Sequence, residues 1–105
     1  MDEFERIGRA DDIPPGSCKV VTVKERPIAV FNISGQFFAI HDLCPHEGGP
    51  LHEGRLKGCV IACPWHDLAF DVRNGQGTDG GGYCVGSYAV KVEGDDLFIG
   101  GRRKA

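Results

Sequence analysis

Two short motifs that combine cysteine, proline and histidine constrain this chain more than any other feature. The first is Cys-Pro-His at residues 44–46 and the second is Cys-Pro-Trp-His at residues 63–66, with sixteen residues between them. Thiolate sulfur is a soft ligand that favours zinc, copper(I) and iron–sulfur clusters, and imidazole suits zinc, copper and iron. The two motifs therefore predict one metal site held by Cys44, His46, Cys63 and His66.

The order of the predicted ligands along the chain indicates which kind of metal centre they could bind. Structural zinc sites usually place a closely spaced cysteine pair before a closely spaced histidine pair. Here each arm supplies one cysteine and one histidine. This order suits a site with two metal positions, one bound by both thiolates and one by both imidazoles, as in a Rieske [2Fe–2S] centre. A zinc-bound structural or interaction module remains an alternative at this point.

The rest of the chain is typical of an all-β protein. β-Branched and aromatic runs predict strands at residues 4–9, 18–23, 28–33, 36–41, 59–62, 68–72, 88–92 and 96–100. Turns at Ser34-Gly35 and at residues 93–95 predict two hairpins, and residues 25–27 are predicted to turn. Residues 42–58 are predicted to be mostly loop. No segment carries a helical period over three turns, so we expect a small antiparallel β-sandwich with a loop-rich insertion.

Length and charge exclude several classes of function. A chain of 105 residues predicts a single domain, 1–105. The net charge of −3 lacks the basic excess of a nucleic-acid-binding protein, so no nucleic-acid partner is expected. No apolar run approaches the roughly 18–20 residues that span a bilayer, and the first residues do not read as a signal peptide. We therefore expect a cytoplasmic protein without a membrane partner.

At its two motifs the sequence resembles the Rieske [2Fe–2S] family. Gly49-Pro50-Leu51, Glu53-Gly54 and Phe70-Asp71 also fit the family pattern. The resemblance implies a Rieske-type β-sandwich with a cluster-binding part at about residues 42–82. It implies one [2Fe–2S] cluster, with Cys44 and Cys63 on the inner iron and His46 and His66 on the outer iron.

The resemblance is to the soluble, low-potential ferredoxins of the family. Respiratory members carry a membrane anchor and an extra cysteine in each loop, where this chain has Gly49 and Trp65. They also carry two hydroxyl residues near the cluster, where this chain has Leu68 and Phe70. Hydrogen bonds to sulfur raise the potential, so a value near the bottom of the Rieske range of about −150 to +300 mV is expected. Ferredoxins of this type usually place a proline in the third loop, where this chain has Gly80-Gly81-Gly82.

The resemblance implies a one-electron carrier that is not itself a catalytic enzyme. Its expected partners are a flavin-dependent reductase and a terminal oxygenase, such as a ring-hydroxylating dioxygenase. The alternative is the small Rieske subunit of an NADH-dependent nitrite reductase, which would be a permanent enzyme subunit.

Several residues outside the motifs invite simpler interpretations. Cys18 and Cys59 are predicted to be small buried hydrophobic residues, and Cys84 is less clearly so. His52 is predicted to be a solvated loop residue and His41 a structural one. We expect the rim around the outer histidines, and with it the docking of partners, to involve Glu47, Pro50, Leu51 and Asp67.

Overall fold

The protein is built almost entirely from antiparallel strands. The computed structural model describes residues 4–43, 49–64, 68–78 and 83–103. Its large sheet has the order β1-β9-β8-β4-β3-β2. Those strands are β1 (Glu5–Arg9), β2 (Cys18–Val23), β3 (Arg26–Ile33), β4 (Gln36–His41), β8 (Ser87–Glu93) and β9 (Asp96–Arg103). No helix among the described residues is long and apolar enough to cross a membrane.

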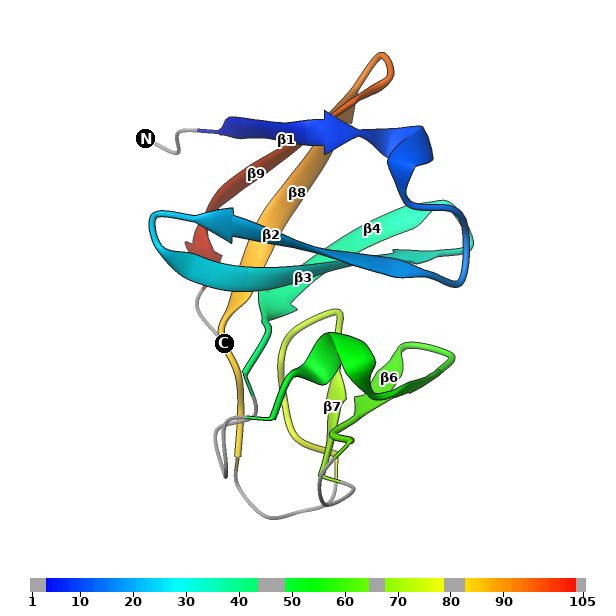
Figure 1. Ribbon diagram of the computed structural model, residues 1–105, viewed down its shortest axis with the longest axis vertical. Helices are drawn as coiled ribbons and strands as arrows, with labels where there is room; N and C mark the ends of the chain where they lie inside the picture. The colour runs from blue at the N-terminus through cyan, green and yellow to red at the C-terminus, as the bar shows by residue number, and fades with distance from the viewer. Residues whose placement is uncertain (1–3, 44–48, 65–67, 79–82, 104–105) are drawn as a thin grey trace.

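A second, smaller sheet lies below the large one, between β4 and β8 along the chain (Figure 1). Its order is β5-β6-β7, and all pairs are antiparallel. Its strands are β5 (Arg55–Lys57), β6 (Val60–Ala62) and β7 (Ala69–Asp71), and the short 3-10 helix η2 (Leu51–Glu53) precedes them. A second 3-10 turn, η1 (Ala10–Asp12), follows β1. The expected all-β sandwich with an inserted part is confirmed.

The β3–β4 hairpin separates two hydrophobic cores. Alternate side chains of a strand point to opposite faces. Ile28 and Val30 of β3 face the upper core, which β8, β9 and Ile13 also line, whereas Ala29 and Phe31 face the lower core of the small sheet. Residues 28–31 are consequently all buried, which explains their continuous apolar run.

Tight turns set the register of both predicted hairpins. The β3–β4 turn, Ser34-Gly35, has positive φ at both residues, as the twist of a two-residue hairpin requires. The β8–β9 hairpin is also confirmed and closes between the paired residues Glu93 and Asp96. A third hairpin joins β2 to β3 through Lys24-Glu25, again with positive φ at both positions.

Two local predictions from the sequence are wrong. The turn expected at residues 25–27 ends one residue into that range, because Arg26 and Pro27 already belong to β3. Pro27 is tolerated there because the pairing of β3 with β4 begins only at Ile28. Residues 42–58 were expected to be mostly loop, yet they contain η2 and β5, which is ordered by pairing with β6.

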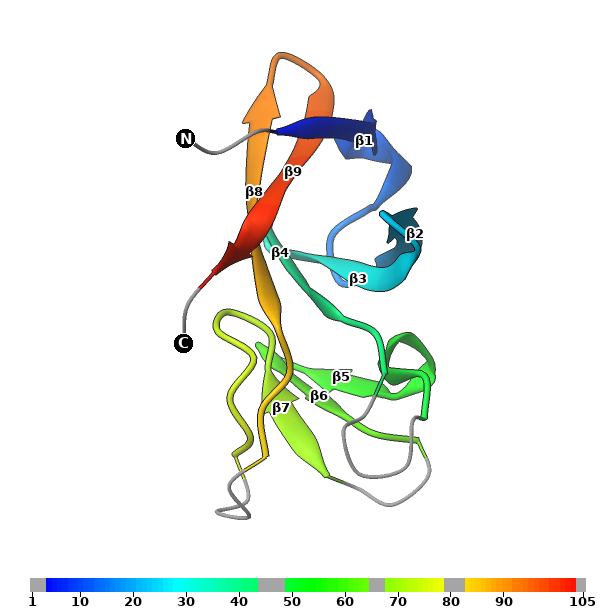
Figure 2. The ribbon, with the colours of Figure 1, turned by 90° about the vertical axis from the view of Figure 1, so that its left-hand side faces the viewer.

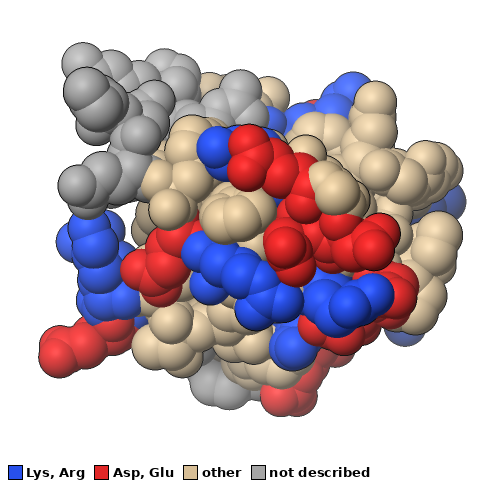
Figure 3. Space-filling view, turned by 90° about the horizontal axis from the view of Figure 1, so that it is seen from above, with Lys and Arg blue, Asp and Glu red and all other residues tan. Residues whose placement is uncertain are grey.

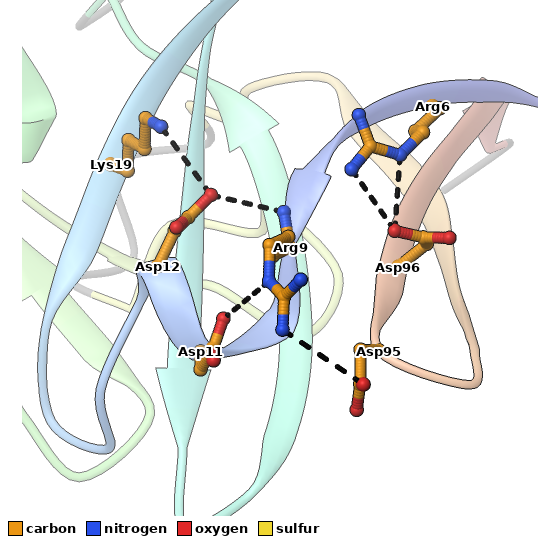
Figure 4. Close-up of polar contacts among 7 residues, drawn as sticks. All are labelled: Arg6, Arg9, Asp11, Asp12, Lys19, Asp95 and Asp96. Atoms are coloured by element: carbon orange, nitrogen blue, oxygen red, sulfur yellow. Dashed lines mark hydrogen bonds and ion pairs between the residues drawn. The ribbon is translucent and has the colours of Figure 1, made fainter.

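Ion pairs join β1 and η1 to the rest of the molecule at the end remote from the small sheet (Figure 4). Arg6 of β1 binds Asp96 of β9 at 3.0 Å, and Asp12 of η1 lies 4.0 Å from the Nζ atom of Lys19 in β2. Within the β1–η1 segment, Arg9 binds Asp11 at 3.2 Å. Asp12 accepts the backbone N–H of Arg9 at 3.0 Å. Viewed from this end, positive and negative side chains are interspersed rather than segregated into a patch of one sign (Figure 3).

Candidate cluster site

Only one of the four predicted ligands lies among the described residues. Cys63 is described, whereas Cys44, His46 and His66 lie outside the described residues. Trp65, Glu47, Asp67 and the glycines at 80–82 also lie outside them. The described part of the site consists of Cys63 and of the residues at the bases of the segments that contain the other three predicted ligands.

Cys63 stands at the end of β6, inside the lower core. It is only 1% exposed and packs in a cluster with Leu51, Phe70 and Val72. Its backbone N–H donates to the carbonyl of Leu68 at 2.6 Å. This bond joins the two ends of the segment that contains His66. The β6–β7 pairing continues just beyond this bond, from Ala62 and Ala69. Cys63 is thus held in place by its backbone and almost completely shielded from water, as its predicted role of sulfur ligand requires.

The segment that carries Cys44 and His46 also has a closed base. Leu43 forms an antiparallel bridge with Pro50. One residue further out on each side, the backbone N–H of Leu51 donates to the carbonyl of Asp42 at 2.6 Å. This bond joins the end of β4 in the large sheet to the start of η2, because Asp42 follows β4 and Leu51 begins η2.

The third segment, 79–82, is anchored to β7. Gly77 donates its N–H to the carbonyl of Tyr83 at 2.9 Å, and Thr78 donates to the carbonyl of Ala69 at 2.9 Å. A substituent on Gly77 would lie only 2.6 Å from the Tyr83 oxygen, so this close approach needs glycine. The described residues that flank all three segments lie toward the end of the molecule that holds the small sheet (Figure 2).

Two residues near this end differ from their predicted roles. Leu51 was expected on a docking rim, but it is fully buried because it packs in the lower core against residues of the small sheet. His52 was expected to be solvated, but its Nδ1 lies 2.7 Å from the Oδ2 atom of Asp42 and its ring is two-thirds buried. Pro50 is half-buried, while Leu43 and Tyr83 are exposed at 39% and 38%.

Asp42 is the residue that sequence reasoning missed. Its side chain is 4% exposed, and both of its carboxylate oxygens accept hydrogen bonds from His52 at 2.7 Å. A buried carboxylate must be paired in this way. The sequence feature that could have pointed to Asp42 is its position, directly after a predicted strand and two residues before Cys44.

The remaining cysteines have distinct surroundings. Cys18 is half-buried, and its thiol donates to the carbonyl of His52 at 3.5 Å. Burial, and secondarily the charge of Asp42, raise the pKa of this thiol. Cys59 packs against the lower core as predicted, whereas Cys84 is exposed. No disulfide links the four described cysteines to one another, and the described residues contain no cluster of three or more candidate metal ligands.

A pocket of about 370 Å³ opens beside Cys63. Glu53, Gly54, Arg55, Ala62, Cys63 and Pro64 line it. Gly54 approaches β6 so closely that a Cβ atom would lie 1.8 Å from the Ala62 carbonyl oxygen. Cys63 therefore contributes to the lining of this pocket although the residue is only 1% exposed.

Comparison with known proteins decides the family. The model of the Rieske [2Fe-2S] domain matches residues 3–83. This chain belongs to that family. Ferredoxin CarAc of Metapseudomonas resinovorans is 34% identical over 94% of both chains. The ferredoxin component of the alkene monooxygenase system of Xanthobacter autotrophicus is 33% identical over 93% of this chain and 81% of its own.

Solved structures agree with the family assignment. A chain in the complex of reduced oxygenase and oxidized ferredoxin in carbazole 1,9a-dioxygenase superposes with a TM-score of 0.88 at 33% identity, covering 97% of this chain and 96% of the other. A putative nitrite reductase small subunit superposes with a TM-score of 0.81 but is 19% identical, covering 92% of this chain and 97% of its own, and that likeness concerns the fold alone. The Rieske ferredoxin expected from the motifs is confirmed, and the nitrite reductase alternative is the weaker one.

The residues of the described part fit the cofactor of the Rieske family. A [2Fe–2S] cluster with mixed ligands needs two thiolates and two imidazoles. Cys63 supplies a buried sulfur at the end of a strand, and the closed bases at Asp42–Leu51 and Cys63–Leu68 bound the two segments that contain the other three candidates. The expected Rieske-type cluster is confirmed by the family, and it takes precedence over the zinc alternative.

Proposed function

We propose that this protein is a one-electron carrier between a flavin-dependent reductase and a terminal oxygenase, such as a ring-hydroxylating dioxygenase. The observation that carries the proposal is likeness to a ferredoxin over 94% of both chains, with the two Cys-Pro arms present. The relatives are named as ferredoxin components of oxygenase systems rather than as the oxygenases themselves. We further propose that it works in the cytoplasm, with residues 42–82 as its cluster-binding part.

The proposed ligands are Cys44 and Cys63 on the inner iron and His46 and His66 on the outer iron. When bound, the cluster takes up and releases a single electron. The buried position of Cys63 supports its place on the inner iron. Imidazoles nearer the surface would shorten the path to a partner.

The surroundings of Cys63 support a low potential. Phe70 is fully buried in the same cluster of side chains, and Leu68 is half-buried against it. Neither side chain has a hydroxyl that could donate to sulfur. Because such donors stabilise the more negative reduced state, their lack favours a potential near the lower end of the Rieske range, about −150 mV.

The first test is the EPR spectrum of the anaerobically purified protein after reduction with dithionite. A rhombic signal with the low average g-value of mixed cysteine and histidine ligation is expected. His66→Cys should shift this signal toward that of a plant-type cluster with four cysteine ligands, if the site is assigned correctly. A colourless wild-type protein that retains stoichiometric zinc would contradict the proposal.

The second test separates a carrier from a permanent subunit. Reduction by a flavin reductase from an aromatic dioxygenase system, followed by stopped-flow oxidation by the matching oxygenase, should show rates that fall as salt is raised. Stable co-purification with a large siroheme protein would instead favour the nitrite reductase subunit.

A further inference from the structure

Asp42 and His52 form a contact outside the two Cys-Pro motifs. The carboxylate of Asp42 accepts the backbone N–H of His52 at its Oδ1 atom and the ring Nδ1 of His52 at its Oδ2 atom, both at 2.7 Å. The side chain of Asp42 is 4% exposed and that of His52 is 33% exposed. A charge-assisted pair so poorly exposed to water is stronger than a surface ion pair.

Backbone bonds place this pair at a junction of three parts of the fold. Asp42 donates its N–H to the carbonyl of Pro27 in β3 at 2.9 Å and accepts the N–H of Leu51 at 2.6 Å. The carbonyl of His52 accepts the thiol of Cys18 in β2 at 3.5 Å. The large sheet is thereby tied to η2, which leads into the small sheet.

The pair also encloses the segment that contains two of the proposed ligands. Residues 43–51 run from Asp42 to His52, and within them Leu43 and Pro50 form a bridge. Bringing the ends of a loop together costs entropy, and the contacts at its base offset this cost. We infer that Asp42 and His52, here called the clasp, are positioning residues that hold the first ligand-bearing segment closed and so retain the iron–sulfur cluster.

This inference rests on the proposed function and assigns it a local mechanism. Loss of the clasp leaves a buried carboxylate without its ring partner, which is costly. Because the damage lies at the base of one segment, it favours local opening there over unfolding of the whole domain. Retention of the cluster then depends on His52 as well as on the four proposed ligands.

The test compares iron loss from His52→Ala, His52→Asn and wild-type proteins, each loaded with cluster. The side-chain amide of Asn can donate from nearly the position of Nδ1, so it restores the clasp. Under anaerobic EDTA, His52→Ala should lose its visible absorbance about tenfold faster than wild type, equivalent to about 1.4 kcal/mol. His52→Asn should remain within about threefold of wild type because it keeps one donor.

A matched control distinguishes positioning from general stability. Asn32 is also a buried polar residue, 5% exposed, with side-chain bonds of 2.7 and 2.8 Å to Ile13 and Gly35. It lies at the opposite end of β3 from Pro27. Asn32→Ala should lower Tm at least as much as His52→Ala while leaving the rate of iron loss unchanged.

The outcomes separate the inference from the function. If iron loss follows Tm across all variants, or if Asn fails to restore what Ala removes, the clasp is only structural and the inference is wrong. A wild-type protein without a Rieske EPR signal would instead overturn the proposed function. A Rieske signal in every variant, with fast loss confined to His52→Ala, would establish the clasp.

Discussion

At the scale of single residues, the surroundings of each cysteine decide its chemistry. Cys63 is buried at the end of β6, Cys18 is half-buried with its thiol donating to the backbone of His52, and Cys84 is exposed. The thiolate rather than the thiol is the nucleophile, so a raised pKa slows reaction. Burial, followed by the charge of Asp42, raises the pKa of Cys18.

Alkylation should therefore separate Cys84 from Cys18. With iodoacetamide at pH 8, we expect Cys84 to be modified at least about tenfold faster, because its thiol is both exposed and not held in a hydrogen bond to His52. Mass spectrometry of the digested protein measures the two rates separately. Cys84→Ser should remove the fast phase and leave the slow one. Equal rates for the two cysteines in wild type would contradict the inference that burial and its hydrogen bond protect the Cys18 thiol.

The residues of the site differ in how far sequence alone could place them. The four proposed ligands could be named from the sequence because each Cys-Pro arm is a local pattern, and their assignment stays a prediction. The environment of His52 was predicted wrongly because its partner, Asp42, lies ten residues away and is brought back by the bridge between Leu43 and Pro50. Leu51 looked like a loop residue for the same reason, since its burial depends on the small sheet packing above it.

At the scale of elements, the tight approach of η2 to β6 depends on a glycine. Gly54 has φ −78°, which any residue can adopt, but a Cβ atom would lie 1.8 Å from the Ala62 carbonyl oxygen. Gly54→Ala should lower the free energy of unfolding by about 1–3 kcal/mol through overpacking. Gly101→Ala is the control, because its Cβ atom would meet nothing within 4 Å. Urea unfolding measures both, and equal effects would show that the backbone shifts freely at Gly54.

The turn after β7 should give stability that depends on pH. Asp71 accepts two side-chain hydrogen bonds from Arg73, at 3.0 and 2.7 Å. The side-chain bond from Arg73, aided by its backbone N–H and its charge, lowers the pKa of Asp71 against the opposing effect of burial. A carboxyl with a lowered folded-state pKa contributes stability above its unfolded value of about 3.9, and this is lost as the pH falls through the folded value.

Arg73→Gln tests this contribution. Because the Arg73 side chain is 58% exposed, solvent screening makes the loss of unfolding free energy at pH 7 small. The difference from wild type should begin to shrink as the pH falls below the unfolded-state pKa of about 3.9, and it should vanish only once Asp71 is protonated in both folded proteins. Urea titrations at several pH values measure it, and a difference that stays constant down to pH 3 would assign the effect to packing alone.

The strands show which elements a local pattern can predict. The hairpins β3–β4 and β8–β9 were predicted because alternation and a short turn coincide in each. The strand β5 was missed because Arg55-Leu56-Lys57 has only three residues and becomes a strand through its pairing with β6. The turn before β3 was misplaced because Pro27, a usual turn residue, occupies the start of a strand.

At the scale of the whole molecule, the order of the strands lay beyond local patterns. The pairing of β1 with β9 and of β4 with β8 joins distant parts of the chain, and only the family resemblance predicted a Rieske-type sandwich. This topology divides the apolar residues into two cores on either side of the β3–β4 hairpin. One core supports the large sheet, and the other contains Cys63.

Two buried leucines test whether these cores act separately. Leu51 lies in the lower core at 0% exposure and Leu97 lies in the upper core at 1%. Leu→Ala at either position should lower the free energy of unfolding by about 2–5 kcal/mol, measured by urea unfolding. Only Leu51→Ala should also speed the loss of iron to EDTA, because Leu51 packs with Cys63 and follows the first ligand-bearing segment, whereas Leu97 has neither contact. Equal acceleration by both variants would mean that the cluster leaves through global unfolding, so that the two cores form one cooperative unit despite their separate packing.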